Sequence, residues 1–394
     1  MSVTKFKIKH TKIIAYTYQS TPWRRTSGDD VRIDTILKYI SRGELLYAFT
    51  LGLDGKNQTV RREKVLYLVQ PRPVYSLLSK IFNWKNHYDL NPLAKATLYI
   101  DEIILALRLA RMEKTAIYIF GSMTLMPAFL RTFGYKGKII YDPLSNYAQT
   151  LYLRSRKSLS ETLKYGLYLA LHRVALRASD VVIYPSRIDR DNAIRMYRNL
   201  HKKTIKVVPN PIPICYQSIE EYNSYRSRKA DDKPHFVLLA RSNGASNEEA
   251  VKLTIEVFSR VKKPYKLTIT GSWHHLNPYN PNIKIVGYLP TERLKELLAT
   301  ADYGLVPVFT HAAGTFLKTI TYIAAGLDVI TTPLGIDLEL IQQTHTKIYL
   351  LRRPEDYLPT VNQIIDNHNP NRDRKPLLCT QAEKRITEAL EGLG

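Results

Sequence analysis

The residue types best suited to chemistry lie in one segment, residues 301–339. An apolar run of strand length, residues 303–308, leads into small residues, and from Thr315 the apolar residues recur at helical spacing. Gly314 lets a ligand approach the backbone closely, and the first N–H groups of the helix favour an anion there. Lys318 lies about one helical turn further on, within reach of the same point. These residues predict a cradle for a diphosphate; the alternative is a buried strand–helix–strand unit with Lys318 as a solvated surface charge.

The same segment carries a family resemblance. Its sequence, AGTFLKTITYIAAGLDVITTPLG, resembles the donor-site motif of family 4 type retaining glycosyltransferases of the GT-B fold. In that family the Gly-Thr backbone and the Lys hold the diphosphate of a nucleotide sugar, which implies this role for Gly314, Thr315 and Lys318. The family's ribose-binding Glu falls on Thr321, and an earlier Glu falls on Ala313. Thr321 offers a ribose hydroxyl one hydrogen bond instead of the two-point grip of a carboxylate.

Three further positions of the second half match family motifs. A basic residue after the strand at 235–240 pairs with the diphosphate in the family, which implies a catalytic role for Arg241 beside Lys318. Arginine suits phosphate because its planar fork donates two parallel hydrogen bonds. Gly271 closes the strand KLTITG, and the loop that contains Tyr288 normally meets the nucleotide base. The resemblance therefore implies donor contacts at Gly271 and Tyr288.

Two positions of the first half also point to a ligand. The loop after the first strand ends near Gly28, where a doubly wound domain places ligands and a glycine permits close approach. Asp29 and Asp30 follow; they are predicted as helix N-caps, with a catalytic or metal-binding role as the alternative. Asp142 ends the strand at 138–141, a place that lies near the donor sugar in the family. We therefore expect Gly28 and Asp142 to contact the donor.

The fold predicted from these elements is α/β. A chain of 394 residues is too long for one ordinary core, and the resemblance implies GT-B: two Rossmann-like doubly wound domains that face each other across a cleft. The predicted divisions are a basic acceptor-side domain at 1–212, a polar linker at 213–233, a nucleotide-sugar donor domain at 234–375, and a helix at 376–394 that crosses back to the first domain.

The charge of the chain is unevenly distributed. Of the formal +23, residues 1–214 carry +21, from 36 Lys and Arg against 15 Asp and Glu, whereas residues 215–394 carry +2, from 22 against 20. This asymmetry favours an anionic partner for the first half. The alternative is solubility charge in a protein of a hot habitat.

One basic segment of the first half has the composition of an interfacial membrane helix. Residues 81–84 place Ile, Phe and Trp between Lys80 and Lys85. The alternative is a core helix with two surface lysines. The first interpretation predicts an anionic membrane surface as a partner.

Cysteine count and hydropathy bear on location. Cys215 and Cys379 lie far apart and match no metal spacing, so the sequence argues against a disulfide framework. No apolar run approaches the roughly 18 residues that a spanning helix needs, and the N-terminus has no signal-peptide core. We therefore expect a cytoplasmic protein, attached peripherally to the inner face of the membrane if the anionic partner is lipid.

The function that these features predict is sugar transfer from a nucleotide-diphosphate sugar, with retention and without metal or other cofactor, to an anionic lipid, glycan or protein acceptor. Without a metal, Arg241, Lys318 and the helix start must stabilise the leaving diphosphate. One alternative is a GT-B binding protein that has lost catalysis, suggested by Thr321 and Ala313. Another is a nucleic-acid-binding or nucleic-acid-glycosylating protein, less favoured because the chain contains no recognised nucleic-acid-binding module.

Overall fold

The chain forms two compact units. Unit 1 comprises Met1–Val208 with Leu390–Gly394, and unit 2 comprises Pro209–Ala389. The structure is a computed structural model, and it describes the residues in the following ranges. These are 13–17, 28–41, 44–51, 58–70, 74, 77, 92–112, 116–144, 147–155, 158–197, 200, 203–240, 245–276, 278–309, 316–333 and 338–391.

Unit 1 is built on an eight-stranded sheet of order β3-β4-β2-β1-β5-β6-β7-β8. The pair β3–β4 is antiparallel, and the other neighbouring pairs are parallel. The strands are β1 (Ile13–Thr17), β2 (Leu46–Leu51), β3 (Gln58–Arg62), β4 (Val65–Gln70), β5 (Ala116–Phe120), β6 (Ile139–Asp142), β7 (Val181–Tyr184) and β8 (Thr204–Val207).

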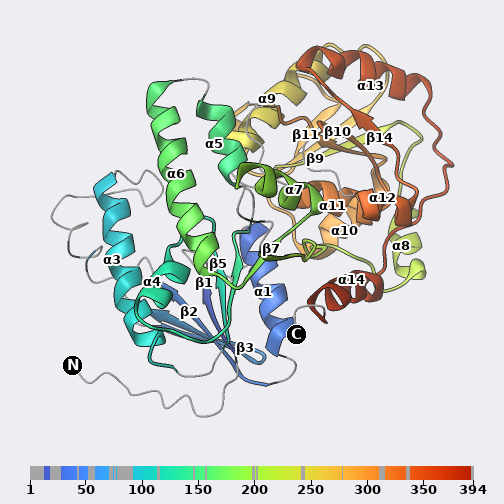
Figure 1. The fold of residues 1–394 in the computed structure, drawn as a ribbon. Coiled ribbons are helices and arrows are strands. Elements are labelled where there is room, and N and C mark those ends of the chain that lie inside the picture. Colours follow the sequence, from blue (N-terminus) through green and yellow to red (C-terminus); the bar gives the residue numbers. More distant parts are fainter. Residues whose placement is uncertain are drawn as a thin grey trace. The chain divides into compact units, whose positions relative to one another are not determined.

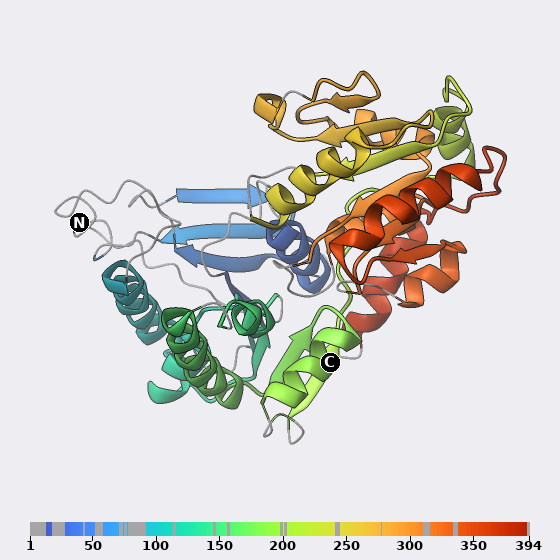
Figure 2. The same cartoon turned by 90° about the horizontal axis from the view of Figure 1, so that it is seen from above.

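Four parallel strands of this sheet, β1, β5, β6 and β7, are buried almost throughout, as their sequences require. IIAYT, AIYIF, IIYD and VVIY are continuous runs of apolar and aromatic residues rather than alternating ones. Helix α1 covers one face, and α3, α4 and α6 cover the other (Figures 1 and 2). The helices are α1 (Gly28–Ser41), α3 (Pro92–Leu109), α4 (Met126–Thr132), α5 (Tyr147–Ser155), α6 (Leu159–Ala178) and α7 (Arg187–Met196).

Unit 2 is built on a six-stranded parallel sheet of order β11-β10-β9-β12-β13-β14. The strands are β9 (His235–Leu239), β10 (Lys266–Thr270), β11 (Ile283–Ile285), β12 (Tyr303–Val306), β13 (Asp328–Thr331) and β14 (Ile348–Leu350). The helices are α8 (Ile219–Arg226), α9 (Ala245–Ser259), α10 (Thr291–Thr300), α11 (Leu317–Ala324), α12 (Leu338–Thr344), α13 (Tyr357–Asp366) and α14 (Cys379–Glu391), with 3₁₀ turns at η3 (His274–Leu276) and η4 (Pro354–Asp356).

The strand and helix predictions for residues 301–339 are confirmed. The strand predicted at 303–308 is β12, the helix after Thr315 is α11, and the next strand is β13. Gly326 follows the C-cap of α11 with φ at +75°, the left-handed conformation that favours glycine after a helix. The strands predicted at 138–141, at 235–240 and at KLTITG also form, as β6, β9 and β10.

The segment predicted as an interdomain linker, residues 213–233, instead belongs to the core of unit 2. It contains α8, and Ser218 caps this helix by accepting a hydrogen bond from the Glu221 N–H. Tyr216 and Tyr222 are buried in the hydrophobic core of the unit, with their rings edge to face. The composition of the segment is polar because one side of α8 faces solvent, while a few tyrosines supply its buried contacts.

A buried carboxylate joins several elements of unit 2. Asp302, which precedes β12, is fully buried and accepts hydrogen bonds from Lys229 Nζ at 2.9 Å, from the His235 N–H at 2.8 Å and from Arg374. Arg226 lies 3.4 Å away. Burial alone would raise the pKa of this carboxyl group, but Arg374, the His235 N–H and Lys229 outweigh burial and hold the pKa below its usual value.

The two cysteines are joined, which corrects the expectation drawn from their separation in sequence. Cys215 and Cys379 form a disulfide with 5.1 Å between their Cα atoms. The Cys379 N–H donates to the Tyr216 carbonyl at 2.9 Å, and Tyr216 bridges to Leu378, so the two segments lie side by side. Distance along the chain says nothing about distance in space. The bond closes a loop of 164 residues that holds nearly all of unit 2.

We predict that breaking this bond destabilises unit 2. Cross-linking stabilises mainly by restricting the unfolded chain, and a loop of this size is worth about 2–5 kcal/mol. Cys215→Ser should lower the free energy of unfolding by this amount in urea denaturation followed by tryptophan fluorescence. Reducing agent should do the same to the wild type and nothing to the double variant Cys215→Ser/Cys379→Ser. Equal denaturation midpoints for oxidised and reduced wild type would contradict the prediction.

Candidate functional site

The candidate site of unit 2 lies at the carboxyl ends of β9 and β12. These strands are neighbours at the centre of the sheet, and the chain leaves β9 toward β10 on one side and reaches β12 on the other. In doubly wound sheets a ligand binds where the strand order reverses in this way. Helix α9 follows β9, and α11 follows β12, so the amino ends of both helices lie at this edge.

A tyrosine separates the two strands at this point. Strand β12 pairs with β9 at two positions but with β13 at four. Beyond the last pair, the fully buried Tyr322 accepts a hydrogen bond from the Leu239 N–H at 2.6 Å. Gly304 makes room for the ring, since a Cβ atom there would lie 2.2 Å from it. The side chain thus satisfies a strand N–H at the place where the sheet opens.

Of the two predicted catalytic residues, Arg241 and Lys318, the structure describes Lys318. It lies at the start of α11. Its Nζ donates to the Asn247 side-chain oxygen at 2.7 Å and lies 5.8 Å from the centre of the Phe316 ring. No carboxylate pairs with it among the described residues. Burial lowers its pKa to about 8, since the surrounding protein disfavours the charged form. An ammonium held without a counter-ion can bind an anion.

Helix α9 positions both sides of this site. Asn247 in its first turn holds Lys318, and the Glu249 carboxylate accepts from the Phe309 N–H at 2.8 Å, which fixes the chain as it leaves β12. The N-cap of α11 is Phe316, whose side chain cannot cap the helix. Sequence reasoning missed Asn247 and Glu249. The SNEE sequence that opens α9 was available as a signal, but its partners lie about 60–70 residues away.

Gly271 and Tyr288 lie on the β10–β11 side of the same sheet. Gly271 has φ at +104°, and a Cβ atom there would lie 2.0 Å from the Ala240 carbonyl oxygen. Its N–H donates to the Gly287 carbonyl at 2.7 Å. A backbone contact at the end of β9 therefore requires this glycine, whether or not a ligand is bound. Tyr288 follows Gly287 and is 59% exposed; its contact with a base stays a prediction.

Of four further residues predicted for the nucleotide-sugar site, the structure describes Thr321. Thr321 is buried, and its hydroxyl donates to the Leu317 carbonyl of its own helix at 2.7 Å. Its proton is therefore already used, and only its lone pairs are open to a ribose. Arg241, Gly314 and Thr315 lie outside the described residues.

In unit 1, Asp142 has a structural partner that the sequence did not reveal. Its Oδ2 accepts from Arg32 Nε at 3.0 Å and Nη2 at 2.8 Å, and its Oδ1 accepts from the Leu144 N–H at 2.8 Å. Arg32 also donates to the Val208 carbonyl at 2.9 Å, and both charged side chains are buried. The pair ties α1 to the ends of β6 and β8. This gives Asp142 a role in holding the fold; its contact with a donor sugar stays a prediction.

The start of α1 carries the other predicted residues of unit 1. Gly28 is its first residue, so Asp29 and Asp30 lie in the first turn. The helix dipole stabilises negatively charged side chains at this position. Desolvation and the charges of Asp30 and Asp142 raise the pKa of Asp29 to about 6, against the opposing charge of Arg32. Asp29 still keeps exposed surface. A carboxylate with this pKa at the carboxyl edge of the sheet can exchange a proton near neutral pH.

The described residues contain no group of three or more His, Cys, Asp or Glu side chains arranged to share a metal ion. The sequence has one Asp-x-Asp pair, Asp189 and Asp191, on α7. Asp189 is buried and accepts from the Ser186 hydroxyl at 2.6 Å, while Asp191 accepts from Arg190 at 2.8 Å. Both carboxylates are therefore occupied within the protein. Within the described ranges, no helix is long and apolar enough to cross a membrane.

Comparison with known proteins agrees with this geometry. Residues 233–367 match the family model of glycosyl transferases group 1. No curated protein matches the chain. The match lies within unit 2 and includes Lys318. It confirms the resemblance to GT-B glycosyltransferases noted in the sequence.

Similar solved structures cover both units. Sucrose-phosphate synthase from Thermosynechococcus elongatus is 12% identical, with a TM-score of 0.66 over 96% of this chain and 95% of that chain. The lipopolysaccharide outer core galactosyltransferase WaaB is 11% identical, with 0.58 over 97% and 100%. The catalytic domain of starch synthase IV from Arabidopsis thaliana, bound to ADP and acarbose, is 10% identical, with 0.57 over 96% and 94%. The fold is GT-B, and together with the family match it supports glycosyl transfer in general.

We predict that anion binding at this edge weakens as pH rises through about 8, because Lys318 then loses its charge. The measurement is calorimetric titration with pyrophosphate between pH 6.5 and 9.5. Lys318→Arg should keep its affinity over the upper part of this range, since guanidinium stays protonated. Pyrophosphate also changes its charge over this pH range, but the change is the same for both proteins and does not affect the comparison between them. Parallel pH profiles for the two proteins would contradict the prediction.

Proposed function

We propose that the protein transfers a sugar from a nucleotide-diphosphate sugar, with retention and without a metal. The observation that carries the proposal is Lys318: a lysine with lowered pKa and no acidic partner among the described residues, at the head of a helix where the strand order reverses. A leaving diphosphate is the charge that such an ammonium would stabilise. The ADP in the starch synthase IV structure supports a nucleotide diphosphate as the kind of ligand.

Charge stabilisation is the main chemistry assigned to the protein. As the bond between sugar and diphosphate breaks, negative charge gathers on the diphosphate oxygens, and preorganised donors there lower the barrier. Lys318, the Gly314–Thr315 backbone and Arg241 are the proposed donors. Retention follows the family resemblance, in which the acceptor attacks from the face that the diphosphate leaves, so no protein nucleophile is assigned.

A second candidate, a binding protein of the same fold without catalysis, is favoured by one observation. The Thr321 hydroxyl donates to its own helix, so the position of the family Glu offers a ribose no donor and no carboxylate. Turnover of a nucleotide sugar separates the two candidates. If a nucleotide binds but no sugar is transferred or released as free sugar, the second candidate holds.

We predict that Arg241→Ala and Lys318→Ala each lower turnover about a hundredfold or more, which is the usual effect of removing one preorganised donor at developing charge. The donor is first found with a thermal-shift panel of UDP-, GDP- and dTDP-sugars, since a bound ligand raises the melting temperature. The unfolding midpoints of the two variants without ligand should match the wild type. Wild-type turnover in either variant would remove that residue from the diphosphate site.

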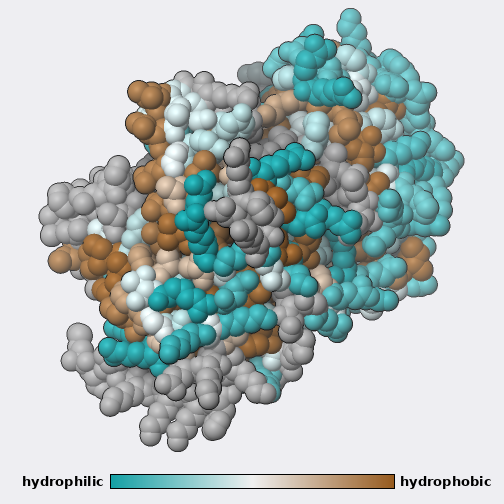
Figure 3. All heavy atoms as spheres, viewed as in Figure 1, coloured by the Kyte–Doolittle hydropathy of each residue, from teal (hydrophilic) through white to brown (hydrophobic). Residues whose placement is uncertain are grey.

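We further propose that the acceptor is anionic, with a membrane that carries acidic lipids as the surface on which it is met. The donor is itself anionic, yet the excess charge lies on the first half of the chain, so the donor does not account for it. The basic segment at 80–85 lies outside the described residues. Helix α6 of the same unit exposes an apolar stripe, Leu159, Leu163 and Leu167, which are 76%, 66% and 62% exposed. Figure 3 shows hydrophobic surface along this helix.

We predict that the protein sediments with anionic liposomes but not with neutral ones, and that salt releases it. Each basic residue near an anionic surface contributes about 1 kcal/mol, and shallow insertion of apolar side chains adds to this. Leu163→Ser should weaken sedimentation, whereas Ile188→Ser, which removes an exposed apolar residue of α7, should not. Equal sedimentation with both lipid types, or none with either, would favour a soluble or nucleic-acid acceptor, which salt-dependent DNA retention would test.

A further inference from the structure

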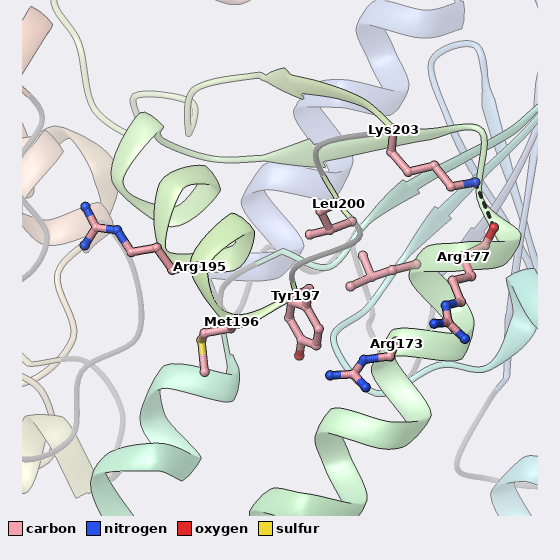
Figure 4. A pocket seen from close by; sticks show the side chains of 8 residues that line it. Arg173, Arg177, Arg195, Met196, Tyr197, Leu200 and Lys203 are labelled. Atoms are coloured by element: carbon pink, nitrogen blue, oxygen red, sulfur yellow. Dashed lines mark hydrogen bonds between the residues drawn. The ribbon is translucent and has the colours of Figure 1, made fainter.

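A cavity of about 310 Å³ lies at the opposite edge of the first sheet from the start of α1. Helices α6 and α7 end there, and β7 and β8 begin there, so the cavity opens at the amino ends of the parallel strands (Figure 4). Its volume is at the lower end of the range for small-molecule sites. The family motifs and the candidate site account for none of its lining residues, which are Arg173, Leu176, Arg177, Arg195, Met196, Tyr197, Leu200 and Lys203.

Two arginines supply the charge of this cavity. Arg173 and Arg177 are exposed, lie one turn apart on α6, and have no acidic partner in the part of the chain that the structure describes. Like charges at this spacing destabilise a helix. By contrast, Arg131 of the same unit bonds Asp180 at 2.5 Å and also donates to the Tyr135 and Gly137 carbonyls. Among the described residues of this unit, Arg131 has a structural role and an acidic partner, whereas Arg173 and Arg177 have no acidic partner.

A lysine adds a third positive charge at the rim. Lys203 Nζ donates to the carbonyls of Arg177 and Ser179, each at 2.8 Å. These bonds hold the ammonium at the carboxyl end of α6 and leave one of its three protons for a ligand. Arg195 also lines the cavity, but its guanidinium points away from the other two arginines (Figure 4).

Apart from its three arginines and Lys203, the described residues of the cavity are uncharged and mainly apolar. Leu176, Tyr197 and Leu200 are buried beneath it. The Tyr197 hydroxyl is already bonded to His172 Nδ1 at 2.8 Å, and burial lowers the pKa of His172 to about 3, so this ring is neutral. The floor therefore offers neither a negative charge nor a free hydroxyl to the arginines.

We propose that this cavity binds a small organic phosphate, with the phosphate group on Arg173 and Arg177 and the organic part against the apolar floor. Guanidinium forks match phosphate oxygens, and two arginines with a lysine suit a dianionic monoester better than a single carboxylate. The volume exceeds what a bare phosphate needs, and the floor favours an apolar portion. A free phosphate ester and the head group of a monoester lipid present the same chemistry here.

The test is calorimetric titration of the full chain with glycerol phosphate, in a Lys318→Ala background so that the site at Lys318 does not contribute and the cavity is left free. We expect saturable binding that Arg173→Gln/Arg177→Gln weakens at least tenfold, as loss of charge-assisted hydrogen bonds does. Lys164→Gln is the matched control, because it removes one charge from an exposed side chain of the same helix outside the cavity. It should bind as the wild type does.

Vesicles distinguish the two sources of phosphate. Binding to phosphatidic acid vesicles in preference to phosphatidylglycerol vesicles, lost in the double arginine variant and kept in Lys164→Gln, would identify a lipid monoester as the ligand. Binding of glycerol phosphate without this preference would identify a free ester. No saturable binding of either, or equal binding by the double variant and the wild type, would overturn the proposal. None of these outcomes depends on sugar transfer, since the donor site is not measured.

Discussion

The wedge that Tyr322 forms between β9 and β12 is the interaction on which the candidate site depends. A parallel sheet tends to continue its ladder to the ends of its strands, which would close the edge where a ligand must enter. Here the phenol takes the place of the ladder, satisfies the Leu239 N–H and holds the strand ends apart. Gly304 is small because the ring passes over it. Four residues downstream of Lys318 on α11, Tyr322 also anchors the helix that carries the lysine.

Much of the fold could be predicted because its parallel strands are continuous apolar runs. β6, β9 and β12 are of this kind and were predicted. β2 was missed, although LYAFTL is apolar and turn residues lie on both sides of it, Gly43 before and Gly52 after. β3 was missed because QTVRR is mostly exposed and pairs with β4 as an antiparallel edge strand. The Cys215–Cys379 bond could not be predicted, since it depends on two segments brought together only by the fold of unit 2.

The candidate site could be predicted only where local sequence determines geometry. The strand, the helix start and Lys318 follow one another along the chain, so spacing was sufficient to find them. Their supports come from elsewhere: Asn247 lies 71 residues before Lys318 and bonds to it. The ion pair of Asp142 could not be predicted either, because its partner, Arg32, lies 110 residues away. A strand-end carboxylate has the same local sequence whether it faces a ligand or a buried guanidinium.

The distribution of counter-ions separates structural charges from those assigned to ligands. Burying an ion is costly unless a partner accompanies it, and the fold meets this requirement at Arg32 with Asp142 and at Arg374 and Lys229 with Asp302. Lys318 and the pair on α6 lack such acids among the described residues. A buried cation without a partner lowers stability, and a cation that is already paired cannot readily bind a second anion. Paired cations therefore suit a structural role, and buried cations without an acid suit ligand binding. Lys318, which is largely withdrawn from water, is therefore the cation for which a ligand is the reasonable counter-ion, whereas the exposed pair on α6 is assigned a ligand because the two side chains share one cavity.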